Sequence, residues 1–578
     1  MRKRFFQGPI PNFIKLNNNF NLILLLLLQQ LIIFLPVFSD KFIPHRFGDD
    51  FTVANSGVVN QRNLDFYPNS ISDWFSRIRS RYYLNETMRL IIFGLNENYH
   101  IIAVLFCVVW IISLTILLYS TPNFWSYKMK LVFILLVGAA PYRQEFMLLP
   151  QGDGYILVLF LLSVSLLLIK KSFEVKERWS VLFVFTSFVT FYLSLYLYEV
   201  GSVASIGFTL AILFTKNHPI KNAVYKYSLA FSYPLVTLFH STIIITSTNQ
   251  MWNRSNLRDL SFLEIIGYGI DFTKNYVLSL VRPFASIARN DHEILRFFKV
   301  MFQQPLFTVL VIAFVAYLYT NMKEAKLPYR KVLKFKEKNK KVGMVPVDLL
   351  GSKLRNLTLA IISTLLLTPY LGFLTFSGSF PTRLLLIPTL GISALITVVV
   401  FSDQFGVLAF RKSVRFFTLL LILFFTFFSS YFIQSLNSVS KYDQILTNEI
   451  IKTLKNDKDI VFPVLINFPI PACQEVGFWR WNPSIWESGA GNLTLADALG
   501  KLNGQENQYN QVFYLPRNIP RNGNSISTNA NDISSCSLTQ SSKTYFGYFS
   551  QPVQFDRSLQ NNFQYTFDNQ LKMRRLFR

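Results

Sequence analysis

Residues 20–39 read FNLILLLLLQQLIIFLPVFS, a run without any Lys, Arg, Asp or Glu. A helix needs about 20 apolar residues to cross the hydrocarbon core of a membrane, so this stretch predicts a first membrane-spanning helix. The basic segment Arg2-Lys3-Arg4 precedes it, as in a secretory signal peptide. Because the run is long and no small-residue cleavage site follows it, we expect the helix to be retained.

Apolar runs of the same kind recur along the chain, at 99–120, 131–142, 155–169, 179–198, 200–215, 227–246, 305–320, 356–376, 384–402 and 416–434. Charged residues make up 15% of the chain, against roughly 25% in a soluble domain. This composition excludes a soluble globular enzyme, a disordered protein and a disulfide-rich scaffold. We predict an all-α polytopic membrane protein with about 11 transmembrane helices. The runs 131–142 and 155–169 are short enough to be buried or re-entrant helices instead.

The basic residues predict the orientation. With the N-terminus inside, the inner segments carry 27 Lys and Arg against six acidic residues; they are 1–19, 121–130, 170–178, 216–226, 321–355 and 403–415. Cytoplasmic loops of membrane proteins collect Lys and Arg. The net charge of +25 therefore indicates a cytoplasmic N-terminus and no nucleic-acid partner. The lysines at 128–130 and 170–171 share one side only if 131–169 crosses the membrane twice.

The predicted domains are a transmembrane domain, 1–434, and an extracytoplasmic C-terminal domain, 435–578, of α+β or irregular structure. The transmembrane domain has two large outer loops, 40–98 and 247–304, and the apolar stretches of the second are interrupted by single charges, which is typical of helices in the membrane interface. The tail contains Cys473 and Cys536. An oxidising compartment permits a disulfide between them, and two free thiols are the alternative.

Chemistry is predicted at the outer ends of the helices. The sequence contains no nucleotide-binding glycine motif, no zinc-protease motif and no hydrolase elbow. Coupled transporters need charges at bilayer depth, whereas the predicted spans carry none in their middle. The charged residues instead gather near the outer ends of the runs; they are Asp49, Asp50, Arg89, Arg143, Glu145, Asp153, Glu199 and Arg383.

Two acidic features are candidate catalytic groups. Asp49 and Asp50 are adjacent, and paired carboxylates can deprotonate a hydroxyl or hold a divalent cation such as Mg or Mn. Glu199 lies between two predicted spans, where rigid helices would preorganise a carboxylate. The alternative is that these acids are solvated loop and hairpin residues.

Four arginines are candidate phosphate-binding groups: Arg46, Arg89, Arg143 and Arg383. A guanidinium binds phosphate oxygens with two parallel hydrogen bonds, and a polyprenyl-phosphate headgroup would need such a partner at this depth. Interfacial snorkelling of a helix-end arginine is the alternative for each of them.

The layout resembles the GT-C superfamily of integral membrane glycosyltransferases, and most closely the bacterial membrane glucosyltransferases that decorate O-antigen and related glycans. The resemblance rests on Gly48-Asp49-Asp50-Phe51, on Met88-Arg89-Leu90 and on Leu197-Tyr198-Glu199. The last motif departs from the family, which has a Tyr-Gln pair there. The resemblance covers about residues 1–435.

The resemblance implies transfer of a sugar from a lipid-linked donor, a polyprenyl phosphate, to a glycan or lipid-linked acceptor at the outer face of a bacterial inner or plasma membrane. Asp49 or Asp50 would be the base or a metal ligand, with the choice between them left open. The arginines would neutralise the leaving lipid phosphate. A surface-polysaccharide polymerase or ligase and a lipid or glycan flippase are the alternatives.

Overall fold

The computed structural model describes a large part of the chain. The described residues are 18–38, 99–122, 125–140, 153–197, 201–214, 218–251, 261–289, 299, 301–302, 304–324, 361–368, 385–401, 411–456, 464–468, 512–516, 565–567 and 572–575. Their helices are α1 (Asn18–Phe34), α5 (Tyr99–Ser120), α6 (Tyr127–Ala139), α8 (Asp153–Ser172), α9 (Glu177–Leu197), α10 (Ala204–Phe214), α11 (Ala223–Met251), α12 (Phe262–Arg289), α14 (Pro305–Glu324), α17 (Leu386–Phe401) and α18 (Arg411–Asn456). A further helical stretch covers 361–368.

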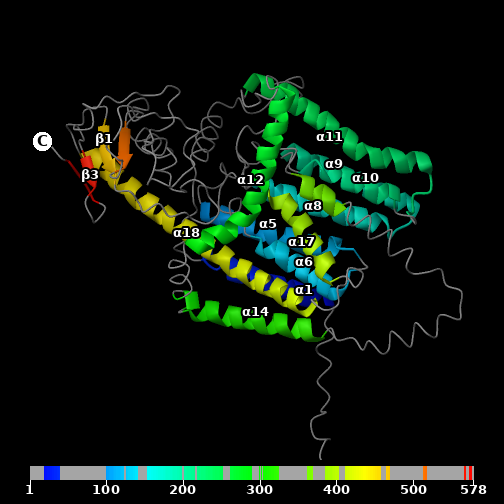
Figure 1. The fold of residues 1–578 in the computed structure, drawn as a ribbon, viewed down its shortest axis with the longest axis horizontal. Helices are drawn as coiled ribbons and strands as arrows, with labels where there is room; N and C mark the ends of the chain where they lie inside the picture. Colours follow the sequence, from blue (N-terminus) through cyan, green and yellow to red (C-terminus); the bar gives the residue numbers. More distant parts are fainter. Residues whose placement is uncertain are drawn as a thin grey trace, which may run out of the picture.

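The helices pack together into a bundle (Figure 1), and apolar side chains form its core. Three described segments are long and apolar enough to cross a membrane: Ala103–Ser120, Glu177–Leu197 and Phe416–Gln434. Large apolar side chains remain exposed on the outer helices, for example Leu235, Leu238 and Phe239 of α11. Exposed apolar surface on this scale is typical of a helical membrane protein. Each predicted run overlaps a described helical segment, although a total of eleven crossings stays a prediction.

The short helix α6 lies at the centre of the bundle, in contact with α1, α5, α17 and α18. The residues from Met129 through Ala139 are buried, except for Lys130, which is half-buried. Ser126 caps its start by accepting a hydrogen bond from the N–H of Met129. The helix therefore differs from the predicted run 131–142, because it begins earlier and stops at Ala139. Pro141 explains the early stop, since proline disfavours helical geometry in the residue before it.

Polar contacts bring several helix ends together at one end of the bundle. The Tyr127 hydroxyl donates to Asn321 Oδ1 (2.5 Å), and the Tyr317 hydroxyl donates to Asn21 Oδ1 (2.7 Å). These bonds join the starts of α1 and α6 to the end of α14. Lys170 similarly joins the end of α8 to the end of α5. We call this the basic end, because it carries Lys170, Lys171, Lys176, Arg178 and Lys221.

A hydroxyl cluster fixes the crossing of α8, α9 and α11. Ser165 and Ser187 lie on facing turns, with their hydroxyl oxygens 2.7 Å apart and each within 2.9 Å of the other's carbonyl oxygen. The Tyr233 hydroxyl donates to Ser187 Oγ at 2.9 Å. Small residues allow close approach of helices in lipid, and their hydroxyls add interhelical hydrogen bonds. The α8–α9 hairpin is consequently a rigid pair.

The last described helix, α18, leaves the bundle and reaches a small sheet (Figure 1). The sheet contains β1 (Val464–Phe468), β2 (Val512–Pro516), β3 (Tyr565–Phe567) and β4 (Met573–Arg575) in the order β2-β1-β3-β4. β1 is parallel to β2 and β3, and β3 is antiparallel to β4. These strands fall in the region predicted to be α+β or irregular. The helix itself continues without a break through the predicted domain boundary at 434–435.

Candidate functional site

The end of α6 is held by two adjacent glutamines of α1. The Gln29 amide donates to the Leu135 carbonyl at 3.0 Å and to Thr426 Oγ1 of α18 at 3.1 Å. The Gln30 amide donates to the Gly138 carbonyl at 3.1 Å and to Gln29 Oε1 at 3.2 Å. Both glutamines are fully buried. All four amide N–H groups of the pair are therefore used, and three helices are joined.

Two further carbonyls at this helix end also have donors. The last four carbonyls of a helix lack intrahelical partners and need others. The Val137 carbonyl accepts from the N–H of Ala140 at 3.2 Å, and the Ala139 carbonyl accepts from Ser429 Oγ at 3.0 Å. Trp110 of α5 completes the network by donating from Nε1 to Gln30 Oε1 at 3.2 Å. Three of the last four carbonyls of α6, those of Val137, Gly138 and Ala139, thus have protein donors.

The length of α6 places this terminus inside the bundle. Thirteen residues span about 20 Å, whereas a hydrocarbon core is about 30 Å thick. Within a membrane, a helix can end at such depth only where protein or a cavity satisfies its backbone. The Gln29–Gln30 network supplies these partners. We call Gln29, Gln30, Trp110, Thr426 and Ser429 the α6 cap.

The candidate residues predicted from the sequence lie outside the described residues. They are Arg46, Asp49, Asp50, Arg89, Arg143, Glu199 and Arg383. Cys473 and Cys536 lie outside the described residues as well. Three described helices begin or end within a few residues of these candidates in the sequence. Ala139 ends α6 shortly before Arg143, Leu197 ends α9 shortly before Glu199, and Leu386 begins α17 shortly after Arg383.

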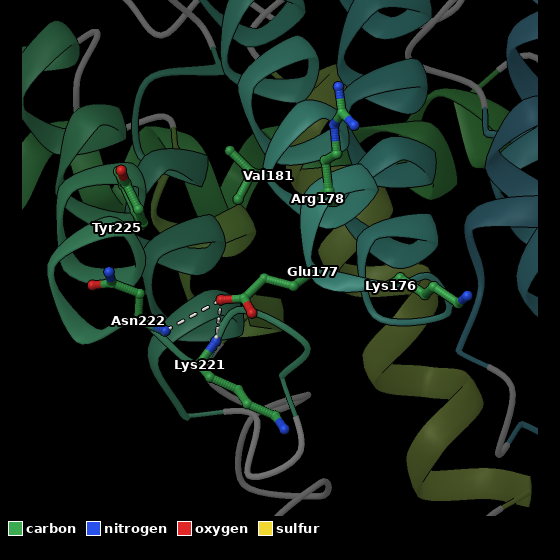
Figure 2. A pocket seen from close by; sticks show the side chains of 7 residues that line it. All are labelled: Lys176, Glu177, Arg178, Val181, Lys221, Asn222 and Tyr225. Carbon is green, nitrogen blue, oxygen red and sulfur yellow. Dashed lines mark hydrogen bonds between the residues drawn. The ribbon is translucent and has the colours of Figure 1, made fainter.

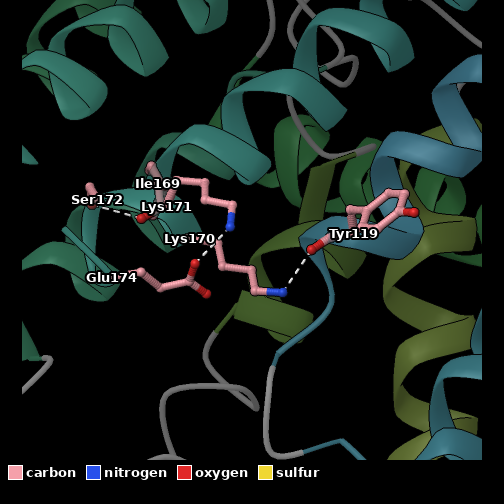
Figure 3. Close-up of polar contacts among 6 residues, drawn as sticks. All are labelled: Tyr119, Ile169, Lys170, Lys171, Ser172 and Glu174. Carbon is pink, nitrogen blue, oxygen red and sulfur yellow. Dashed lines mark hydrogen bonds and ion pairs between the residues drawn. The ribbon is translucent and has the colours of Figure 1, made fainter. Parts of the chain in front are cut away.

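The basic end of the bundle has two lysines with described partners. At the basic end, Lys170 Nζ donates to the carbonyl of Tyr119 at 2.7 Å, and Lys171 pairs with Glu174 at 2.8 Å (Figure 3). A cation beside the last carbonyls of a helix is favoured by the helix dipole. Since α1, α6 and α9 all begin at this end, each of these helices runs away from it.

An open depression of about 760 Å³ lies at the basic end between α9 and α11. Its lining includes Lys176, Glu177, Arg178, Val181, Lys221 and Tyr225. Figure 2 shows that the basic side chains point in different directions, while the Glu177 carboxylate accepts hydrogen bonds from the N–H groups of Lys221 and Asn222. Binding of one small anion needs converging donors. The depression is consequently a structural joint between α9 and α11.

His218 is buried close to this joint, in the connection between α10 and α11. Its Nδ1 accepts a hydrogen bond from the N–H of Ile220 at 3.1 Å, and its ring meets Phe173 edge-on. The neutral ring therefore carries its proton on Nε2, which has no partner among the described residues. Burial, with a smaller effect from Lys226, lowers the pKa of His218 from 6.5 to about 4.

No three His, Cys, Asp or Glu side chains gather into a metal site within the described ranges. A divalent cation held by Asp49 and Asp50 therefore stays a prediction.

No family model, curated protein or solved structure matches this chain.

The sequence reasoning missed the α6 cap. Its signal was present in the run that predicts the first helix, because Gln29 and Gln30 are amides in an otherwise apolar stretch. Polar side chains within a membrane helix usually face the bundle interior and have partners. The partners themselves come from residues about 80 to 400 positions away, which no local pattern identifies.

Proposed function

We propose that the protein is an integral membrane glycosyltransferase that moves a sugar from a polyprenyl-phosphate donor to a cell-surface glycan or lipid-linked acceptor. The reaction takes place at the outer face, opposite the basic end. The N-terminus is then cytoplasmic and the sheet extracytoplasmic, as the positive-inside rule requires.

The observation that supports this proposal is that α1, α6 and α9 run in the same direction. All three begin at the basic end, where α8 finishes and where Lys170, Lys171 and Lys221 lie. The chain therefore exits α1, α6 and α9 on the other side, and those exits precede the acid pair, Arg143 and Glu199 in sequence. Reactive groups on one face suit a donor whose lipid lies in the membrane and whose sugar projects from it.

The α6 cap contributes by fixing the point at which the chain leaves α6. A buried, fully hydrogen-bonded network holds this exit rigidly, and rigid elements are needed beneath a precise site. The segment that carries Arg143 starts from this anchored end. Arg143 and Arg383 are then the arginines whose neighbouring helices, α6 and α17, are in direct contact.

In the proposed reaction, Asp49 or Asp50 accepts the proton of an acceptor hydroxyl. The hydroxyl oxygen forms a bond to the anomeric carbon of the sugar, and the bond from that carbon to the phosphate oxygen breaks. The electron pair leaves with the polyprenyl phosphate. Arginines from the outer rim stabilise the added negative charge on this leaving group. A divalent cation at the acid pair would serve the same purpose.

The test uses membranes that contain the full chain and a panel of radiolabelled polyprenyl-phosphate hexoses. Asp49→Asn and Asp50→Asn are measured one at a time and together, and the loss of transfer is expected to reach 10²-fold or more for the catalytic base. Glu174→Gln is the matched control, because Glu174 is an acid at the basic end, paired with Lys171. It should keep full transfer. Undiminished transfer by the double variant would refute the proposed role of the acid pair.

A further inference from the structure

Helix α12 starts with a complete capping box. Ser261 Oγ accepts a long hydrogen bond, 3.4 Å, from the N–H of Glu264. The Glu264 carboxylate accepts in return from the N–H and the hydroxyl of Ser261, both at 2.7 Å. Two otherwise unpaired donors are satisfied by this exchange, and the start of the helix is fixed. The 28 residues of α12 are therefore a helix with a defined start.

One face of α12 is attached to the bundle. Phe272 and Tyr276 are one turn apart and buried. The Tyr276 hydroxyl donates to the carbonyl of Leu366 at 3.2 Å. Figure 1 shows α12 running across the direction of α11 and α18. The helix therefore runs in a different direction from these two helices and is joined to the stretch 361–368 through Tyr276.

A second face of α12 carries an apolar stripe that the protein leaves uncovered. The stripe consists of Leu263, Ile266, Ile270 and Val277, whose exposed fractions are 78%, 44%, 64% and 52%. The spacings of three, four and seven residues put all four side chains on one face of a helix. Lys274 lies on the same face, and its long stem allows the ammonium to reach a polar layer.

A third face is charged and exposed. Glu264 and Asp271 are seven residues apart and share a face about 100° away from the stripe. α12 also contains Arg282 and Arg289, and each charge at the centre of a membrane costs about 2.5–3.5 kcal/mol. α12 is therefore unsuited to cross a membrane. A position entirely in water would also be unfavourable, because it would expose the whole stripe at a free-energy cost of about 1.5–3 kcal/mol for each large side chain.

We infer that α12 lies flat in the outer leaflet, with the apolar stripe in contact with lipid acyl chains, the Glu264–Asp271 face in water and the Phe272–Tyr276 face on the bundle. Lipid is the occupant that satisfies all three faces at once, because apolar and charged sides about 100° apart match the boundary between acyl chains and headgroups. The position is consistent with the chain order. α11 begins at the basic end and runs away from it, and α12 follows α11 at the opposite end.

The test is a depth measurement on the full chain in nanodiscs of phosphatidylethanolamine and phosphatidylglycerol. Cys107, Cys473 and Cys536 are changed to Ala, and single cysteines are placed at Ile266, Ile270 or Val277 and, as matched controls, at Glu264 or Asp271. Each carries a nitroxide, and its collisions with oxygen, which concentrates in lipid, are compared with those of a water-soluble nickel chelate. All five positions are exposed, so labelling disturbs no core packing.

The three stripe positions should show a severalfold higher ratio of oxygen to nickel collisions than the two control positions, so that accessibility follows the helical period. Equal nickel accessibility on both faces would overturn the inference, because the stripe would then lie in water. Protection of the stripe from both reagents would also overturn it, since that result indicates a protein partner or a second copy of the chain.

Discussion

The side-chain amide of Gln30 donates to the main-chain carbonyl of Gly138 across 3.1 Å, and this contact ties α1 to the end of the buried helix α6. The two residues are 108 positions apart in sequence. Gln30 also accepts from the indole N–H of Trp110. Because a buried polar group without a partner is costly, each of these residues depends on the other two.

Replacing Gln30 with Leu tests this dependence. The substitution removes the donor to the Gly138 carbonyl and the acceptor for Trp110, and each buried group left unpaired costs about 1–3 kcal/mol. The expected result is a clear loss of thermal stability in detergent micelles, measured by intrinsic tryptophan fluorescence. Leu31→Ala is the control, because Leu31 is on the same helix and 40% exposed. Equal midpoints for Gln30→Leu and the unmodified chain would contradict the assigned role of the α6 cap.

Gly138 allows a second test of the α6 cap. A β-carbon at this position would lie 2.6 Å from Gln29 Oε1 and 2.8 Å from Gln30 Nε2. Both amides are held by several hydrogen bonds, so neither can move aside without breaking the network. Gly138→Ala should therefore destabilise the bundle, by about 1–3 kcal/mol as for other overpacked cores.

The control for Gly138→Ala is Gly267→Ala in α12. A β-carbon at Gly267 has nothing within 4 Å, and alanine is the better helix former by about 0.5–1 kcal/mol. The two variants should move the unfolding midpoint in opposite directions under identical conditions. A neutral Gly138→Ala would mean that the glutamines can rearrange.

Much of the helical bundle could be predicted from charge-free runs, because the period and length of apolar segments are local properties. The run 99–120 coincides closely with α5, and 179–198 with α9. The end of α6 was predicted less well, although Pro141 gave a usable signal. Its capping partners, Gln29 and Ser429, come from distant helices and depend on tertiary packing.

The candidate site could be predicted only as a set of residue types near helix ends. The sequence predicts that Arg143 and Glu199 share a side, because successive crossings of a membrane alternate in direction. Distances between such residues are not local properties and cannot follow from spacing. Helix α12 lies within the region 247–304, for which the sequence predicts interfacial helices. Its apolar stripe, however, could be identified only from the exposure of Ile270 and its neighbours in the folded chain.

His218 predicts a dependence of stability on pH. Its pKa is lowered to about 4 in the folded chain, while an unfolded chain titrates near 6.5. The unfolded state therefore binds more protons between these values. The contribution of neutral His218 to the free energy of unfolding is therefore fully present above pH 6.5. It is lost as pH falls toward 4, and the loss is at most about 3 kcal/mol.

The variant that isolates this effect is His218→Asn. The asparagine side-chain oxygen can accept from the N–H of Ile220, as Nδ1 does, but the residue does not titrate. Unfolding midpoints between pH 7.5 and 4.5 should fall less steeply for this variant than for the unmodified chain. Parallel curves would show that another group carries the dependence.

The continuity of α18 can be tested by a distance. A helix rises 1.5 Å per residue, so nitroxides at Leu420 and Lys452 of one straight helix are about 48 Å apart. Pulsed electron resonance should show a narrow distribution near that value. Ser440→Pro removes a helix hydrogen bond between the labels and should broaden or shorten the distribution, while Ser440→Ala should leave it unchanged. If the chain without proline already gives a broad distribution, a hinge divides α18 and the sheet is not rigidly attached to the bundle. A narrow distribution instead means that α18 is one straight helix that keeps the sheet at a constant distance from the membrane. The buried residues beyond the predicted span that would stabilise this part of α18 are Leu446, Ile450 and Leu454.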